Sequence, residues 1–119
     1  MATAKEFVTR IGQIDGVGSC VLVREDGEIL GHSMEDPDLY TSLMILGGTS
    51  ARGIMDKVGF SHCRHLSFNR EGKESFHLFP IDKFYLGVLQ APDCYVPDML
   101  QAVLRLIGRV TTTSPPAEE

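Results

Sequence analysis

The sequence HCRH, formed by His62, Cys63, Arg64 and His65, is the one cluster of metal-ligand residue types in the chain. In a β-strand, His62 and His65 would point to opposite faces and could not hold one ion together. Cys63 and His65 would share a face, and His77 on a neighbouring strand could join them in a suitable register. This trio leaves a thiol or metal enzyme open as an alternative. Polar residues of an edge strand are the simpler interpretation, so we expect no metal site.

Other residues that could do chemistry lack a supporting context. Cys94 lies between Asp93 and Tyr95, and an acidic neighbour raises a thiol pKa and disfavours the reactive thiolate. Ser33 follows His32 directly, but no third group completes a catalytic arrangement. Asp36 and Asp38 flank a proline, so helix capping is the expected role for one of them. We therefore expect no catalytic residues and no enzyme activity.

Two glycine-rich stretches resemble phosphate-binding loops only superficially. GVGSC precedes a predicted strand, whereas a dinucleotide fingerprint follows a strand and opens a helix. LGGTS lacks the lysine of a nucleotide-binding loop and falls within a predicted helix. Adjacent glycines in a helix cost about 1 kcal/mol each relative to alanine. We expect no cofactor, and we expect another group to approach the helix closely at Gly47 and Gly48.

Composition restricts the classes of partner. The 119-residue chain is 43% hydrophobic and carries a net charge of −5, which suits one soluble domain without a basic field for nucleic acid. Cys20, Cys63 and Cys94 make an odd, widely spaced set that is typical of reduced thiols. No apolar run approaches the ~20 residues of a membrane span, and no signal peptide is evident. We expect a cytoplasmic protein that neither binds nucleic acid nor inserts into a membrane.

Hydrophobic periodicity predicts a single α/β domain of the α+β type over residues 1–110. The expected five-stranded sheet is mainly antiparallel and has helices on both faces. The stretch VGSCVLVREDGEILGHS should form a hairpin with a two-residue turn at Asp26 and Gly27. Residues 111–119 should form a disordered polar tail. The predicted elements, in chain order, are a helix from about 5 to 14, the hairpin over 17–33, a helix over 37–58, strands over 61–69, 74–81 and 83–91, and a helix over 97–110.

The helix predicted over 37–58 has an apolar arc that covers more than half of its circumference. This arc is wider than contact with one sheet requires. One stripe consists of Leu39, Leu43, Leu46, Ser50 and Ile54, and we assign it to the chain's own sheet. A second stripe consists of Tyr40, Met44, Gly47, Gly48, Ala51 and Met55, and we assign it to the same helix of a second chain. The predicted edge strand supplies the rest of this dimer interface through His62, Cys63, Arg64, His65, Leu66 and Phe68.

Three stretches carry a resemblance to the roadblock family, which includes the dynein light chains of that name. CVLVREDGEILGHS is similar to the family's first hairpin. DLYTSLMILGGTSARGIMDKVG is similar to its long middle helix, although the double glycine departs from the alanine-rich helix common there. KFYLGVLQAPD is similar to its last strand. The resemblance covers roughly residues 4–110 and rests on pattern and element order.

The resemblance implies a small homodimer, or a heterodimer of paralogues, without an active site of its own. Family members bind and regulate Ras-like small GTPases, in some cases as GTPase-activating partners, or they serve as adaptor subunits of motor and signalling complexes. The runner-up function is a small-molecule sensor of the profilin, PAS or GAF type. Such a sensor would need a pocket lined by Phe76, Phe79, Phe84 and Tyr85, which we expect to pack as core instead.

Overall fold

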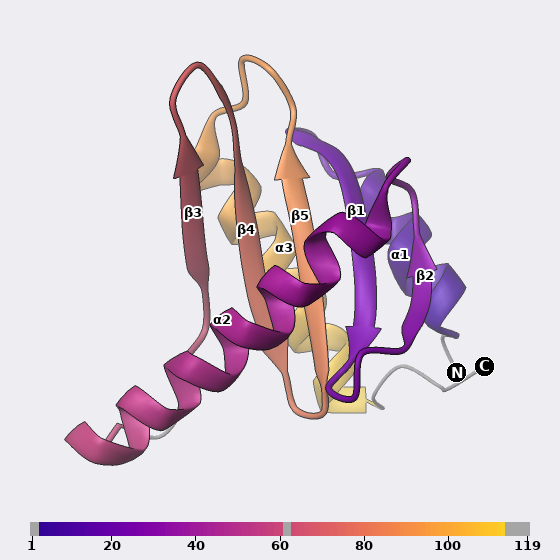
Figure 1. Cartoon of the computed structure of the whole chain (residues 1–119). Helices are drawn as coiled ribbons and strands as arrows, with labels where there is room; N and C mark the ends of the chain where they lie inside the picture. The colour runs from indigo at the N-terminus through magenta and orange to yellow at the C-terminus, as the bar shows by residue number, and fades with distance from the viewer. Residues whose placement is uncertain (1–2, 61–62, 114–119) are drawn as a thin grey trace.

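The structure is a computed structural model that describes residues 3–60 and 63–113. Its order of helices and strands is the predicted one: helix, hairpin, long helix, three strands and helix. The elements are α1 (Ala4–Gly12), β1 (Val17–Arg24), β2 (Ile29–His32), α2 (Pro37–Val58), β3 (Leu66–Arg70), β4 (Lys73–Ile81), β5 (Phe84–Gln90) and α3 (Val96–Thr113) (Figure 1).

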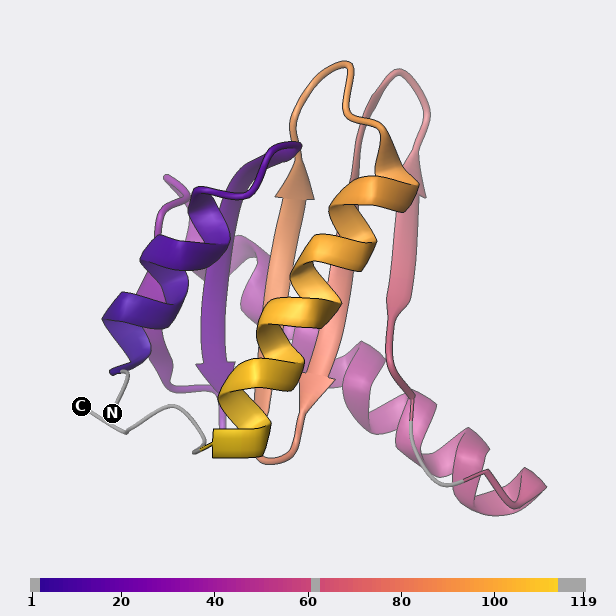
Figure 2. The same cartoon turned by 180° about the vertical axis from the view of Figure 1, so that it is seen from behind.

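The five strands form one antiparallel sheet in the order β2-β1-β5-β4-β3. β1 and β5 lie in the middle, as their continuous apolar runs predict, and β2 and β3 lie at the two edges. α2 crosses one face of the sheet, whereas α1 and α3 cover the opposite face (Figures 1 and 2). The fold is therefore an α+β domain with helices on both faces, which confirms the predicted class.

Each face of the sheet has its own core. Beneath α1 and α3, the buried side chains include Phe7, Ile11 and Val103 from the helices and Leu22 and Leu86 from the central strands. Beneath α2, the buried side chains are Val21, Val23, Met34, Met44, Phe76, Leu78 and Tyr85. Successive residues of a strand point to opposite faces, so β1, β4 and β5 supply both cores.

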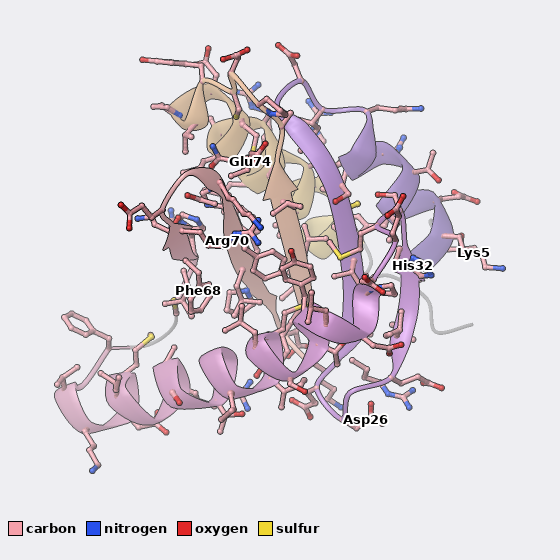
Figure 3. All side chains as sticks on the ribbon, turned by 45° about the horizontal axis from the view of Figure 1, so that its top comes forward. Lys5, Asp26, His32, Phe68, Arg70 and Glu74 are labelled. Atoms are coloured by element: carbon pink, nitrogen blue, oxygen red, sulfur yellow. The ribbon has the colours of Figure 1, made fainter. Side chains whose placement is uncertain are left out.

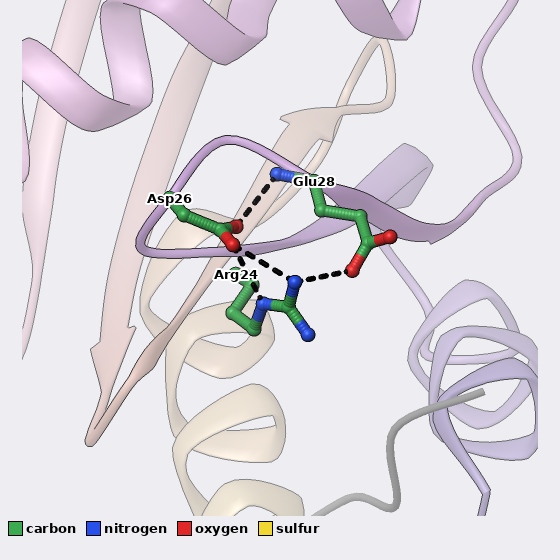
Figure 4. A network of polar contacts seen from close by, with 3 residues as sticks. All are labelled: Arg24, Asp26 and Glu28. Carbon is green, nitrogen blue, oxygen red and sulfur yellow. Dashed lines mark hydrogen bonds and ion pairs between the residues drawn. The ribbon is translucent and has the colours of Figure 1, made fainter.

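The turn of the first hairpin differs from the predicted two-residue turn. Gly27 N–H donates to the Arg24 carbonyl, and Arg24 N–H donates to the Glu28 carbonyl, so three residues form the loop. Gly27 has φ of 97°, whereas Asp26 does not have a positive φ. The Asp26 carboxylate instead accepts hydrogen bonds from the Arg24 guanidinium and from Glu28 N–H, and Arg24 also pairs with Glu28 (Figure 4). These side-chain contacts favour the longer turn.

Two predicted boundaries also shift. α3 continues to Thr113, so residues 111–113 are helical and do not belong to a disordered tail; residues 114–119 lie outside the described part of the chain. β3 begins only at Leu66, whereas the prediction began it at residue 61. Its pairing with β4 ends at the Leu66–Leu78 pair, two residues before Pro80. A proline has no N–H to donate to a longer β3.

Candidate functional site

The two apolar stripes of α2 face in the opposite directions from those predicted. Met44 is fully buried against the chain's own sheet, Gly48 is buried, and Tyr40 stacks on Phe76 with ring centroids 4.7 Å apart. These contacts lie within one chain. The assignment to a partner helix is therefore corrected for Tyr40, Met44, Gly47 and Gly48, which face the sheet of their own chain. Ala51 and Met55 are only partly buried, so their place at a partner chain stays a prediction.

The two glycines explain why this stripe faces the sheet. A Cβ atom placed on Gly48 would lie 2.8 Å from the Tyr85 hydroxyl oxygen and still closer to the Tyr85 ring. A Cβ atom on Gly47 would lie 3.1 Å from Cζ of Phe68, which points from β3 towards α2 (Figure 3). The predicted close approach at the double glycine is confirmed. The approaching groups are aromatic side chains of the chain's own sheet.

The stripe that was assigned to the sheet lies in solvent instead. Leu39, Leu46 and Ile54 are 69%, 66% and 63% exposed, and Leu43 and Ser50 are also exposed. Monomeric soluble proteins rarely expose a large contiguous apolar patch without a use for it. This exposed stripe of α2 is the strongest candidate for an interaction surface.

Two further exposed apolar residues, at the end of α2 and just beyond it, extend this surface. Val58 ends α2, Gly59 follows with φ of 83°, and Phe60 is 68% exposed. The N–H groups of Gly59 and Phe60 both donate to the Met55 carbonyl, which fixes the chain reversal at the end of α2. Phe60 is not among the residues that the sequence predicted for an interface. The signal that could have found it is an aromatic residue directly after a helix-terminating glycine.

The second half of α2 extends past the sheet on the β3 side (Figures 1 and 2). A groove of about 660 Å³ lies against this half, between Ala51 and Met55 of α2, Cys63 and Arg64, and Ile107 of α3. Ala51 and Met55 are only partly buried in one chain. The outer half of α2 thus offers both the exposed stripe and a groove beside the segment that precedes β3.

The predicted edge-strand residues occupy distinct positions. Leu66 and Phe68 pack beneath α2, and β3 forms the outer edge of the sheet as predicted. Cys63, Arg64 and His65 precede the strand, and Arg64 is exposed. His62 lies outside the described residues. The unpaired backbone of β3 is a ready template for another strand.

The histidines of the metal hypothesis do meet. His65 Nε2 lies 3.0 Å from His77 Nδ1, and the Cys63 thiol contacts the main-chain carbonyl oxygen of His65. The remaining neighbours of His77 are Ser67 and Gln90, which are not strong metal ligands. Within residues 3–60 and 63–113, no group of three or more His, Cys, Asp or Glu side chains is arranged to hold a metal ion. The geometry fits a hydrogen-bonded pair of imidazoles.

The other residues that could do chemistry lie in surroundings that do not activate them. Burial raises the pKa of the Cys94 thiol, and the charge of Asp15 raises it further. Burial also raises the pKa of the Cys20 thiol, although a hydrogen bond with Ser33 partly offsets the effect. Asp36 occupies the N-cap position of α2, but its side chain makes no capping hydrogen bond. A raised thiol pKa disfavours the nucleophilic thiolate.

The four aromatic residues of the sensor hypothesis do not line one pocket. Phe76 and Tyr85 belong to the core beneath α2, whereas Phe79 and Phe84 belong to the core beneath α1 and α3. All four are nearly inaccessible to solvent. They pack as core, as predicted.

Comparison with known proteins identifies the fold. No family model matches the sequence, and no curated protein matches it. Among solved structures, the Roadblock/LC7 domain from Streptomyces avermitilis aligns with 94% of this chain and 98% of its own, with a TM-score of 0.69 and 16% identity. The gliding protein MglB from Thermus thermophilus aligns with 92% of this chain and 88% of its own, with a TM-score of 0.71 and 11% identity. Profilin II from Acanthamoeba castellanii gives a TM-score of 0.61 at 12% identity, over 90% of this chain and 98% of its own.

These likenesses define the class of fold. The chain has the roadblock-type fold, with three helices and a five-stranded antiparallel sheet, as its sequence resemblance predicts. In the described part of the chain, no helix is both long enough and apolar enough to cross a membrane.

Proposed function

We propose that this protein is a dimeric scaffold without catalytic activity of its own, which binds a Ras-like small GTPase or serves as an adaptor subunit of a larger complex in the cytoplasm. The exposed apolar stripe of α2 on a roadblock-type fold is the observation that carries the proposal. Burial of apolar surface contributes roughly 25 cal/mol per Å², so this stripe favours a bound partner.

A second copy of the chain is the first partner that we propose. Pairing of two β3 edges would join two sheets into one, because each outer β3 backbone is open in the single chain. The outer half of α2 extends beyond β3, so it would then lie over the partner's half of the joined sheet. The exposed stripe, with Leu46 and Ile54, would meet the partner's α2. In this arrangement, the exposed stripe of α2 takes the place of the stripe that the sequence predicted for the dimer interface. The predicted edge strand remains part of that interface.

The GTPase would dock on the surface that the two chains form together. An interface of this kind buries on the order of 1,600 Å² in total. A scaffold that prefers one nucleotide state would act by stabilising the conformation of the GTPase switch regions, without adding a reacting group. Arg64 is exposed, and Arg52 forms an exposed ion pair with Glu25 at 3.9 Å. We assign both arginines to the solvated surface and do not require either one for function.

Two measurements test this proposal. Light scattering at micromolar concentration should give twice the mass of one chain. Candidate Ras-like GTPases loaded with GDP or with a GTP analogue should then bind with different affinities in a titration. A monomer at high concentration would overturn the dimer. Equal affinity for both nucleotide states would leave only the adaptor role.

A profilin-like binding module is the second candidate. The likeness to Acanthamoeba castellanii profilin II favours it, and the groove beside α2 could receive a ligand. The ligand would bind outside the sheet, since the aromatic residues within the sheet fill the two cores. A chain that stays monomeric and retains the groove would favour this candidate over the scaffold.

A further inference from the structure

His77 is the one polar residue with a buried side chain among those that the structure describes, at 2% exposure. It lies on β4 opposite Ser67 of β3 and Val88 of β5. Its Nδ1 atom lies 2.8 Å from the Ser67 hydroxyl and 3.0 Å from His65 Nε2, and its Nε2 atom lies 2.8 Å from the Gln90 amide oxygen. Both ring nitrogens of His77 are therefore occupied.

These contacts fit one arrangement of protons. With its amide oxygen facing Nε2 of His77, Gln90 is an acceptor, and this orientation matches a His77 that carries its proton on Nε2. Nδ1 of a neutral His77 then has one lone pair, which His65 Nε2–H and the Ser67 hydroxyl share. His65 also stacks on the rings of His77 and Phe79, with centroids 5.1 and 5.0 Å away. The pair is fully satisfied when both imidazoles are neutral.

The hydrogen bond between the two rings is lost when both rings are protonated. A doubly protonated pair would carry N–H groups on both His65 Nε2 and His77 Nδ1, which point at each other across 3.0 Å. The two rings would also carry like charges. Over the described ranges, no charged side chain is among the hydrogen-bonding partners of the pair.

The described elements packed around the pair supply no compensating anion. The inner side of α3 is apolar, and its charged residues Asp98, Arg105 and Arg109 are exposed. On β5 the contact is the neutral Gln90, and on β3 it is the neutral Ser67. Burial lowers the pKa of His65, and the charge of a protonated His77 lowers it further.

The segment that precedes β3 is attached to the sheet through His65. Residues 63–65 precede β3 and form no strand, because pairing with β4 stops before Pro80. The hydrogen bond and ring stacking of His65 therefore attach this segment to the sheet. Loss of these contacts of His65 would also expose the beginning of the edge strand β3.

We propose that His65 and His77 form a pH-sensitive latch, which fixes residues 63–65 and the start of β3 to the sheet when the pair is neutral and releases them when both rings are protonated. A histidine whose pKa is lowered in the closed state stabilises that state at high pH. This stabilisation is lost as the pH falls below the ordinary value of 6.5 towards the lowered pKa. The latch depends on contacts within one chain and not on the proposed function.

Amide hydrogen exchange measured by NMR at pH 7.5 and 5.5 tests the latch. After correction for the intrinsic exchange rate, protection of the β3 amides should fall several-fold at pH 5.5, because the hydrogen bond between the two rings is then lost. Protection of the β5 amides should stay constant and serve as the internal reference. Long-range nitrogen–proton spectra of the imidazoles should show His77 protonated at Nε2 alone at pH 7.5.

His65→Gln is the informative variant. Its amide can donate to a neutral His77, and after rotation its oxygen can accept from a protonated one. Protection of β3 should then change less than about twofold between the two pH values. His32→Gln, at an exposed histidine on the other edge, should keep the response of the parent protein. A parent protein whose β3 loses no more protection than β5, or a His65→Gln variant that loses as much as the parent, would overturn the latch.

Discussion

The ring of Tyr85 lies against the backbone of α2 at Gly48, where the space for a Cβ atom is already filled by the tyrosine. Gly48→Ala should therefore destabilise the chain, because either α2 or Tyr85 must move. We expect a net loss of up to about 2 kcal/mol, because overpacking costs about 1–3 kcal/mol and alanine gains ~1 kcal/mol over glycine in a helix. Urea denaturation measures the difference, and Gly48→Leu should have a larger effect.

Gly53→Ala is the matched control on the same helix. Apart from its two chain neighbours and the nearby backbone of α2 itself, no atom of the described residues lies within 4 Å of a Cβ atom placed there, so only the helix propensity changes. We expect this variant to be as stable as the parent or up to about 1 kcal/mol more stable. Equal stability changes in the two variants would contradict the close contact with Tyr85.

A charge on the exposed stripe of α2 should separate the proposed dimer without unfolding the chain. Leu46→Asp and Ile54→Asp replace side chains that are 66% and 63% exposed, so the core of each monomer stays intact. Light scattering should change from twice the chain mass to the mass of one chain, with the circular dichroism spectrum preserved. Thr49→Asp, at an exposed position on a different side of α2, should remain a dimer. Persistence of the dimer in both stripe variants would exclude this surface as the interface.

The carboxylate of Asp26 should titrate below its ordinary range because of Arg24. The hydrogen bond from the guanidinium is the largest cause of the lowered pKa, followed by the hydrogen bond from Glu28 N–H. A carboxyl group with a lowered pKa stabilises the fold above its ordinary pKa of 3.8, and this contribution is lost as the pH falls through the lowered value. In Arg24→Met, NMR titration should show the Asp26 pKa moving upward, with part of the depression retained through Glu28. An unchanged titration curve would show that the main-chain contact alone is responsible.

Two of the three thiols should react more slowly than a free thiol. Cys20 is completely buried and its pKa is raised, so an alkylating reagent at pH 7.5 should reach it only after denaturation. Cys94 is partly exposed but also has a raised pKa, so it should react more slowly than a free thiol. Mass spectrometry of protein labelled with iodoacetamide gives the order. Rapid labelling of Cys94 in the native protein would indicate an activation that its surroundings do not explain.

The sequence predicted the fold well because long periodic patterns define its elements. The continuous apolar run from Cys20 to Val23 predicted a central strand, and all four residues are fully buried. Pro37 and Gly59 mark the two ends of α2, whose bounds agree with the prediction. Residues that start or stop a helix, together with hydrophobic periodicity, were sufficient to predict these elements.

The orientation of α2 could not be read from periodicity, because both of its stripes are apolar. The glycine pair decides which stripe of α2 faces the sheet. It does so because the aromatic rings of Phe68 and Tyr85, which lie on strands distant in the sequence, occupy the space beside the glycines. The start of β3 was mispredicted for a similar reason. The residue that ends its pairing is Pro80, which belongs to the neighbouring strand β4. Contacts between elements that are distant in sequence decided both features.

The central pairing of β1 with β5 has a consequence for how the chain folds. Arg24 pairs with Phe84 and Val17 with Gln90, so β2, α2, β3 and β4 all lie between the two partners in the sequence. During synthesis, the first hairpin leaves the ribosome long before the strand that completes the middle of its sheet. Such distant pairing carries a large loop-closure entropy and slows folding. The N-terminal hairpin and the sheet-facing stripe of α2 therefore depend on β5 for part of their burial, and a nascent chain that stalls before β5 would be prone to aggregation.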